Sequence, residues 1–241
     1  MKQYNRYKFK SGAELVKGEK PFFIELLVKN VDKGMVVLDL GCGSGELALQ
    51  LSRYCKKIVG IDCCAKYIKT ALKDKKNRKI SNVIFKISDA KKLPFKNSSF
   101  DLIYSSRGPL SANADFLRDA FRVLKPGGLL LEETIGETDK IELKRIFRRG
   151  QNFPYTFKKQ TLVKKLLDKF KIELTYLKNF VYYQKFPSLA SVVRVLERTP
   201  IIPDFNRHQD RESLKKIKLL DKNGGIILRA HRLWWIGRKR K

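Results

Sequence analysis

The chain has 241 residues, of which 43% are hydrophobic and 11% aromatic, enough to bury the core of one large α/β domain. Charged residues make up 32%, a high fraction that is still typical of a globular rather than a disordered chain. There are 53 Lys and Arg against 24 Asp and Glu, a formal net charge of +29. Such a charge favours binding to phosphate polymers, but a proteome-wide lysine bias produces the same composition.

The four cysteines are Cys42, Cys55, Cys63 and Cys64, and their spacing fits no zinc motif. We therefore expect reduced thiols and no metal site. No apolar run reaches the length of a membrane span, and residues 1–10 lack the apolar stretch of a signal peptide. These features predict a cytoplasmic protein.

The apolar pattern changes along the chain. Apolar residues at helical spacing predict a helix over 12–30, with a break at Pro21. Near-continuous apolar runs, typical of buried parallel strands, then alternate with amphipathic segments, typical of helices. Strands are expected at 35–40, 57–62, 83–87, 100–104 and 129–132, with helices at 46–53, 65–75 and 115–124. This order predicts a parallel sheet with helices on both sides.

The last third of the chain has a different pattern. Helices are expected at 160–170, 186–196 and 210–220, and strands at 172–183 and 226–237. We interpret residues 1–241 as a single domain with two additions to its core. The additions are an N-terminal helical cap, residues 1–30, and an insertion, residues 184–224, between the last two strands.

A glycine loop joins the first buried strand to its helix and reads Gly41-Cys42-Gly43-Ser44-Gly45. At such a turn, backbone N–H groups are expected to point outward, and a ligand can approach closely. Glu46 occupies the place of the third glycine of dinucleotide-binding loops, and Asp39 ends the strand before the loop. The combination favours a ligand with an amino-acid end over a pyrophosphate.

Two further carboxylates follow the next strands. Asp62 closes the second strand, where a carboxylate can accept hydrogen bonds from a ribose diol. Asp89 follows the third strand, where it can reach the exocyclic amine of an adenine. Together with Asp39, these residues would line one crevice at the carboxyl edge of the sheet.

Five motifs occur in order within residues 33–135: V-V-L-D-L-G-C-G-S-G, G-I-D, S-D-A-K-K-L-P-F, F-D-L-I-Y-S and R-V-L-K-P-G-G. They resemble the motifs of class I S-adenosylmethionine-dependent methyltransferases. The chain is similar to the broad group that includes ubiquinone and menaquinone C-methyltransferases. The resemblance implies a Rossmann-like α/β fold with a seven-stranded, mostly parallel sheet. Its last strand would be antiparallel, and helices would cover both faces.

The resemblance also implies S-adenosylmethionine as the cofactor and suggests which residues hold it. Those for the methionine moiety are Asp39, Gly41, Gly43 and Gly45, those for the ribose and adenine are Asp62, Asp89 and Ala90, and Ser105 lies near the methyl sulfonium. Cys42 and Cys63, which neighbour these positions, are included in the expected cofactor site.

No catalytic residue is identified from the sequence. Methyl transfer from a sulfonium is an in-line displacement, so a base is needed only where the acceptor must lose a proton early. The candidates are Tyr104, Arg107, Glu132, Glu133, His208 and His231. Structural roles compete with these: His231 as a strand residue with a satisfied hydrogen bond, His208 as a solvated loop residue, and Arg107 as an ion-pair partner. Alternation places one of the two glutamates, not identified, toward the crevice.

The acceptor remains open between hypotheses. A small molecule is the first, and an RNA (tRNA or rRNA) that uses the basic surface is the second. A nucleic-acid-binding protein without enzymatic activity is the third, and the intact cofactor positions disfavour it. No Asn-Pro-Pro-Tyr motif follows the fourth strand, which disfavours amino methylation of a base or a glutamine by that route. An aliphatic roof from residues 184–224 would favour the small molecule, whereas basic residues of 158–171 and 215–222 at the crevice mouth would favour RNA.

Overall fold

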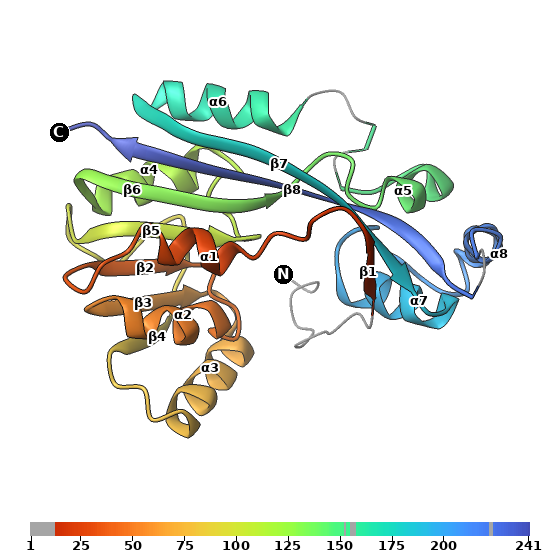
Figure 1. Cartoon of the computed structure of the whole chain (residues 1–241), viewed down its shortest axis with the longest axis horizontal. Helices are drawn as coiled ribbons and strands as arrows, with labels where there is room; N and C mark the ends of the chain where they lie inside the picture. Colours follow the sequence, from red (N-terminus) through yellow and green to blue (C-terminus); the bar gives the residue numbers. More distant parts are fainter. Residues whose placement is uncertain (1–12, 152, 155–157, 222–223) are drawn as a thin grey trace. The chain divides into compact units, whose positions relative to one another are not determined.

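The computed structural model describes residues 13–151, 153–154, 158–221 and 224–241. Within them the strands are β1 (Glu14–Lys17), β2 (Val36–Leu40), β3 (Lys57–Asp62), β4 (Val83–Ile87), β5 (Phe100–Ser106), β6 (Leu124–Ile135), β7 (Ile172–Phe186) and β8 (Ile226–Lys239). The helices are α1 (Phe23–Val28), α2 (Glu46–Leu51), α3 (Ala65–Asn77), α4 (Ala114–Val123), α5 (Ile141–Phe147), α6 (Lys159–Lys169), α7 (Leu189–Arg198) and α8 (Arg211–Lys218). The strands form one sheet in the order β1-β7-β8-β6-β5-β2-β3-β4 (Figure 1).

The chain divides into two compact units. The larger unit contains residues 22–134, 160–178 and 233–241. The smaller unit contains residues 135–159 and 179–232 together with the segment before Phe22, as far as these are described. Strands β6, β7 and β8 contribute residues to both units.

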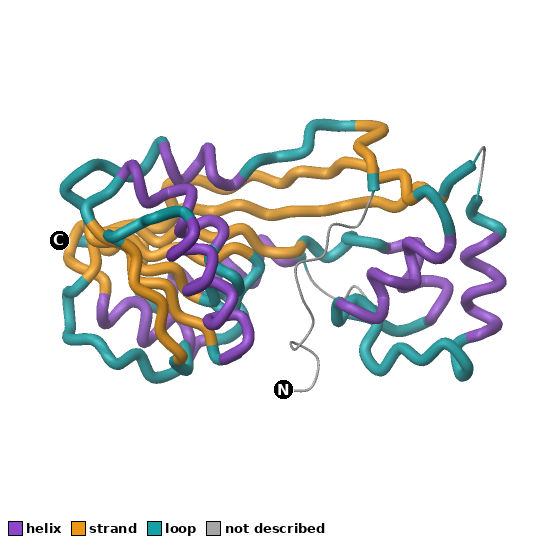
Figure 2. Tube along the Cα trace, turned by 90° about the horizontal axis from the view of Figure 1, so that it is seen from below, coloured by secondary structure: helices purple, strands orange, loops and turns teal. Residues whose placement is uncertain are grey.

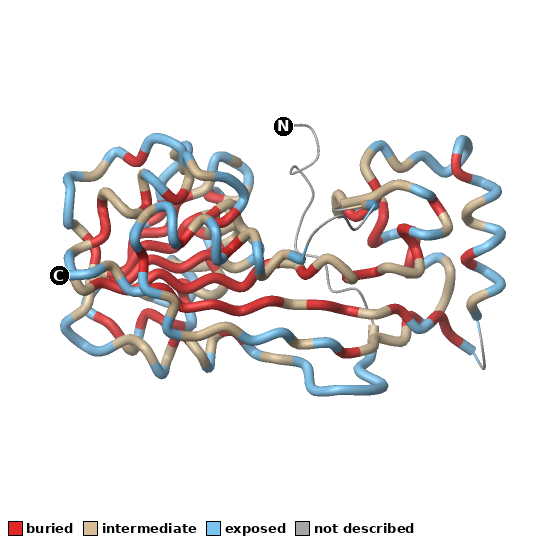
Figure 3. The backbone as a smooth tube through the Cα atoms, turned by 90° about the horizontal axis from the view of Figure 1, so that it is seen from above, coloured by how far each residue is buried: buried red, intermediate tan, exposed pale blue. Residues whose placement is uncertain are grey.

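The centre of the sheet is parallel, as the sequence predicts. β2 pairs with β3 and β5, β3 with β4, and β5 with β6, all in parallel register. The strands β2, β3, β5 and β6 are apolar because they are covered on both faces, and Figure 3 shows buried strands in the larger unit. The edge strand β4 alternates buried and exposed residues. In such a sheet the carboxyl ends of the strands meet at one edge, where ligands bind in open α/β folds.

β8 runs antiparallel to β6. Trp235 on β8 bonds Glu132 on β6, while the preceding Trp234 bonds the following Glu133, so one residue number falls as the other rises. Figure 1 draws the β8 arrow against that of β6. The mostly parallel α/β fold with an antiparallel last strand is therefore confirmed. The sheet has eight strands rather than seven because β1 is added to it.

Helices cover both faces of the sheet in the larger unit (Figure 2). α4 and α6 bury Leu117 and Val163 in a cluster with Leu40 of β2 and Trp235 of β8. On the opposite face, Phe23 of α1 packs edge-on against the Tyr104 ring, with 6.5 Å between the ring centroids. The face that carries Tyr104 is the one that matters for the site below.

The expected helix over 12–30 is wrong in its first part. Glu14–Lys17 forms β1, which pairs antiparallel with β7, and the helix α1 covers only Phe23–Val28. Gly18, with φ +82°, separates the two elements, and its Cα lies so close to β7 that a Cβ would meet the carbonyl of Val181 at 2.9 Å. The helical spacing of apolar residues misled because it was counted across this turn. Residues 1–12 of the expected cap lie outside the described residues.

The smaller unit has its own hydrophobic core. It is built from α5, α7 and α8 with parts of β7 and β8, and its buried residues include Phe147, Val192, Ile202, Ile217 and Leu228. Ser188 and Ser191 form a capping box that begins α7. The sequence did not predict α5. Its Lys140 and Arg148 caps both adopt left-handed backbone conformations, which sequence patterns do not signal in lysine or arginine.

Candidate functional site

The backbone N–H groups of the glycine loop are mostly used within the protein. The amides of Gly41 and Cys42 both donate to the carbonyl of Ile61, each at 2.9 Å, and the amide of Gly45 donates to Cys42 at 2.9 Å. The amide of Gly43 donates to the Asp62 carboxylate, also at 2.9 Å. The expectation that these N–H groups point outward is therefore wrong for these four residues. Hydrogen bonds to Ile61 and Asp62 of β3 hold the loop in its conformation. A ligand would therefore pack against the loop rather than bond to these N–H groups.

The loop has open space above its middle glycine. Gly41, Gly43 and Gly45 all have positive φ, at 79°, 53° and 77°. A Cβ on Gly45 would collide with the ring of Phe85, and one on Gly41 would meet Pro109 at 3.1 Å. A Cβ on Gly43 would meet nothing within 4 Å. Gly43 is the point where a ligand can lie against the loop.

Replacing Gly43 with alanine tests this space. We expect Gly43→Ala to weaken binding of a cofactor at the loop by tenfold or more, because the methyl group fills the open space. Stability should fall by only about 1–2 kcal/mol, the cost of a left-handed alanine. Gly45→Ala is the matched control, expected to lose more stability because of the collision with Phe85. Calorimetry and urea unfolding measure the two quantities, and equal binding by Gly43→Ala and the wild type would contradict the assignment.

Asp62 lies half-buried at the end of β3 and organises the neighbouring backbone. One carboxylate oxygen accepts the Gly43 amide and the other accepts the amide of Cys64 at 2.8 Å. Each oxygen retains capacity for a further hydrogen bond. Ile87, the register partner of Asp62 on β4, is 60% exposed although it is apolar. Exposed Cys63 follows Asp62 directly, so the carboxylate has two uncharged side chains beside it.

Asp39 is buried under the loop and paired with a tyrosine. Only 2% of Asp39 is exposed, and the Tyr104 hydroxyl donates to its carboxylate at 2.8 Å. Burial and, to a smaller extent, the charge of Asp62 raise the pKa of Asp39 to about 7, against the lowering effect of the Tyr104 hydrogen bond. Burial and the Asp39 charge raise the pKa of Tyr104 well above its ordinary value.

The groups that act on Asp39 do not neutralise its charge. They are a neutral tyrosine and a second carboxylate. A buried carboxylate without a cationic partner is costly when ionised. A ligand that brings a positive charge beside the glycine loop would therefore be stabilised by Asp39, with Asp62 as the second anion.

The remaining expected cofactor residues have varied surroundings. Asp89 is exposed and accepts the amide of Lys91 at 2.8 Å, and Ala90 after it is half-buried. Ser105 is fully buried, and its hydroxyl donates to the carbonyl of Leu40 at 2.8 Å. Their contacts with a cofactor stay predictions.

None of the four cysteines forms a disulfide bond, and burial raises the pKa of three of them. Burial is the main cause for Cys42 and for Cys63, and it raises the pKa of Cys55 to about 11. These thiols are therefore protonated near neutral pH. Within the described ranges, no group of three or more His, Cys, Asp and Glu side chains is placed to hold a metal ion.

Two catalytic candidates have structural partners. Both ring nitrogens of His231, in the smaller unit, are engaged, with Thr138 Oγ1 and Asn179 Oδ1 each at 2.8 Å, and burial lowers its pKa. The structural interpretation of His231 is confirmed. Tyr104 is fully buried on Asp39. Neither side chain is free to contact an acceptor, and His208 is exposed, as expected.

Arg107 and the two glutamates lie at the ends of β5 and β6. Arg107 has φ +58° and a side chain that is 59% exposed, and its Nε lies 3.8 Å from Glu133 Oε1. The expected ion pair is therefore present. Glu132 and Glu133 accept hydrogen bonds from the indoles of Trp235 and Trp234.

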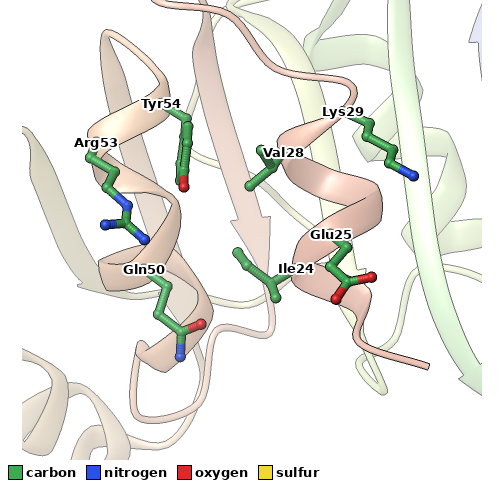
Figure 4. Close-up of a pocket in the computed structure, with 7 residues that line it drawn as sticks. All are labelled: Ile24, Glu25, Val28, Lys29, Gln50, Arg53 and Tyr54. Atoms are coloured by element: carbon green, nitrogen blue, oxygen red, sulfur yellow. The ribbon is translucent and has the colours of Figure 1, made fainter. Parts of the chain in front are cut away.

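A separate hollow lies between α1 and α2. Figure 4 shows Ile24 and Val28 of α1 facing Tyr54, which follows α2. Its volume is about 400 Å³, and none of its lining residues belongs to the expected cofactor set. The Arg53 guanidinium carbon lies over the Tyr54 ring, 5.1 Å from the ring centroid.

Sequence reasoning missed several features of the site. It did not pair Tyr104 with Asp39 or assign Ile87 to the surroundings of Asp62. Both relations depend on strand register, which sets Asp39 beside Tyr104 and Asp62 beside Ile87. A sequence signal existed only for Ile87, an apolar residue at the end of a strand.

A family model described as a methyltransferase domain matches residues 31–179, more than half of the chain. An uncharacterised methyltransferase, YcgJ of Bacillus subtilis, is 31% identical over 136 residues, which is 53% of this chain and 53% of that protein. The ubiquinone/menaquinone biosynthesis C-methyltransferase UbiE of Azotobacter vinelandii is 38% identical over 118 residues, 46% of each chain. The matches thus span about half the length of these curated relatives.

Solved structures share the fold. The YcgJ structure from Bacillus subtilis superposes with a TM-score of 0.68 at 19% identity, covering 90% of this chain and 98% of that one. A methyltransferase described as putative, from Bacillus halodurans, gives a TM-score of 0.66 at 21% identity, covering 91% and 98%. At these identities the likeness establishes the fold. No helix in the described part of the chain is long and apolar enough to span a membrane.

Proposed function

Because this chain belongs to the methyltransferase domain family, we propose that it transfers a methyl group from S-adenosylmethionine to an acceptor by in-line displacement. The observation that carries the proposal is a pair of interacting carboxylates together with the open space at Gly43. Asp62 accepts the Gly43 amide, and Asp39 is buried on the strand that leads into the loop. S-adenosylmethionine carries an ammonium and a sulfonium, and so supplies the positive charge that this pair lacks.

The residues fit the parts of this cofactor. Asp39 would attract the ammonium of the methionine moiety. The methionine moiety would pack against the backbone at Gly43, where no side chain is in the way. Asp62 would hold the ribose hydroxyls with its remaining lone pairs. Ile87 and Cys63, beside Asp62, would flank the adenine. The cofactor is already activated when bound, so the protein's task is to align the acceptor and exclude water.

A small-molecule acceptor is supported by the relatives, since UbiE is named for quinone biosynthesis. The net charge of +29 favours RNA as the second candidate. Exposed lysines occur on α3 of the larger unit and on α8 of the smaller unit. Among the described residues, the positive charge is therefore spread over the surfaces of both units. This spread fits a general lysine bias at least as well as a nucleic-acid groove.

A labelling experiment separates the two acceptors. The full chain is incubated with tritiated-methyl S-adenosylmethionine and with either the small-molecule fraction or the total RNA of a strain that lacks the gene. We expect label in the small-molecule fraction. Label in RNA from the deletion strain, and not in RNA from the parent strain, would instead establish the RNA methyltransferase.

Asp62→Ala tests the cofactor site in the same assay. We expect the affinity for S-adenosylmethionine to fall at least tenfold, because the variant loses both the ribose partner and the acceptor of the Gly43 amide. Asp115→Ala, at an exposed side chain of α4, is the matched control and should bind normally. A melting temperature close to that of the wild type excludes unfolding, and unchanged affinity would contradict the role of Asp62.

A further inference from the structure

Two adjacent carboxylates on β6 have opposite environments. Glu132 is fully buried and accepts the Trp235 indole at 2.8 Å and the amide of Ser111 at 3.1 Å. Glu133 accepts the Trp234 indole at 3.0 Å and the Ser106 hydroxyl at 3.1 Å, and its side chain remains 11% exposed. Glu133 is thus the one of the two that an outside molecule can reach.

Glu133 lies on the same face of the sheet as Asp39. In the parallel register, Asp39 is beside Tyr104, and Ser106, two residues further along β5, is beside Glu133. Residues two apart on a strand share a face. Phe23 confirms it, because its ring contacts both Tyr104 and Trp234, the latter with 5.5 Å between centroids.

The same register sets the position of Glu133 relative to the cofactor residues. β6 is two strands from β2, about 10 Å across the sheet, and Glu133 is about 7 Å nearer the carboxyl ends of the strands than Asp39. This places Glu133 at the ligand edge, beyond the residues that would hold the methionine moiety. All of these residues belong to the larger unit.

The Glu133 carboxylate has hydrogen-bonding capacity to spare. An ionised carboxylate has about four lone-pair sites, and Ser106 and Trp234 occupy one on each oxygen. Arg107 Nε, at 3.8 Å, is beyond hydrogen-bond distance, and its side chain is mostly exposed. The two fixed donors orient the carboxylate while leaving it able to accept from a further donor.

We propose that Glu133 binds the acceptor through an O–H or N–H group and takes its proton during methyl transfer; this rests on the proposed function above. The bond between the acceptor heteroatom and the methyl carbon forms as the sulfonium–methyl bond breaks, which leaves S-adenosylhomocysteine. The proton of the heteroatom passes to the Glu133 carboxylate and from there to water. The acceptor class is therefore a phenol, another hydroxyl compound or an amine, methylated on oxygen or nitrogen.

The two tryptophans of the chain provide a built-in readout. Each donates its indole N–H to one of the two glutamates. In full-length protein labelled with ¹⁵N-tryptophan and saturated with S-adenosylhomocysteine, catechol, tyramine and benzylamine are added in turn. We expect at least one probe to shift the Trp234 indole resonance and leave that of Trp235 in place. Glu133→Gln assigns the Trp234 resonance and should abolish the shift.

Methyl transfer to the responding probe completes the test. With tritiated-methyl S-adenosylmethionine, Glu133→Gln should lose at least 100-fold in rate while its cofactor affinity stays within twofold of the wild type. Glu173→Gln, an exposed residue of β7, is the matched control and should keep the wild-type rate. Mass spectrometry should locate the methyl on oxygen or nitrogen.

Four results would overturn the proposal. They are a full rate in Glu133→Gln, methyl found on carbon, no Trp234 response to any probe, and no transfer to any probe, each in protein that binds S-adenosylmethionine. A wild-type protein that does not bind S-adenosylmethionine would overturn the proposed function as well, so the two failures are distinguishable.

Discussion

Asp39→Asn is expected to make the protein more stable above pH 7 while removing most of its affinity for S-adenosylmethionine. Burial raises the pKa of Asp39 to about 7 in the folded chain. In the unfolded chain an aspartate titrates near its ordinary value, so the folded state holds a proton between about pH 4 and pH 7 that the unfolded state has lost. The stability of the wild type should therefore fall as the pH rises through this window.

The size of this effect follows from the shift. A difference of about three pKa units corresponds to about 4 kcal/mol, taken as an upper bound. Asparagine retains an oxygen to accept the Tyr104 hydroxyl and does not ionise. Urea unfolding should show the variant more stable than the wild type at pH 8, with the difference shrinking toward pH 4. Parallel pH profiles for the two proteins would contradict this interpretation.

The affinity for the cofactor is expected to change with pH in the opposite direction to stability. Ionised Asp39 attracts the ammonium of the cofactor, so wild-type affinity should rise between pH 6 and pH 8, and the Asn variant should stay weak throughout. Tyr104→Phe is the companion variant. It removes the hydrogen bond that lowers the pKa of Asp39, so both pH transitions should move upward. If the Asn variant binds S-adenosylmethionine as tightly as the wild type at pH 8, Asp39 has no role in cofactor binding.

Asp139→Ala is expected to destabilise the smaller unit by about 3–5 kcal/mol, the cost of breaking a buried ion pair from one side. Asp139 accepts Arg232 at 2.7 Å and the His231 amide at 3.0 Å, with Lys140 Nζ at 4.0 Å. Without it, Lys140 and Arg232, whose side chains are 5% and 13% exposed, become buried cations that lack this carboxylate.

The pH dependence gives this second prediction a further test. Burial alone would raise the pKa of Asp139, but Lys140 and Arg232 outweigh it and the pKa is lowered. Its stabilisation is therefore present above the pKa of an unfolded aspartate and disappears as the pH falls below it. Asp115→Ala is the control, because its pair with Arg118 is exposed on both sides and is worth about 0–1 kcal/mol. Equal losses in the two variants would contradict the account.

Much of the larger unit could be predicted from the sequence. The strands β2, β3 and β5 are short apolar runs that are buried along most of their length, and the edge strand β4 is a short, largely apolar run as well. The helices α2 and α4 begin just after a glycine and an asparagine. The glycine loop and Asp62 were recognisable because each follows or ends a strand. The strands β2 and β3 are neighbours in the sheet, so their carboxyl ends meet at the same edge. Such local patterns coincide with the final structure when short connections join neighbouring elements.

The features that the sequence could not supply depend on register and long-range pairing. β1 forms only because β7, far away in the chain, offers it an edge. The choice between Glu132 and Glu133 required the pairing of β6 with β8, which decides which tryptophan each carboxylate meets. Likewise, the raised pKa of Asp39 arises from burial under a loop, and alternation along one strand does not report burial.

Isothermal titration of the intact chain with S-adenosylmethionine shows directly whether the cofactor binds. We expect saturable one-site binding at pH 8, weaker binding at pH 6, and an affinity at least tenfold lower in Asp62→Ala. S-adenosylhomocysteine, which keeps the ammonium, should bind at the same site. An absence of binding by the folded wild-type protein at millimolar S-adenosylmethionine would contradict the assignment of Asp39, Gly43 and Asp62 to a cofactor site.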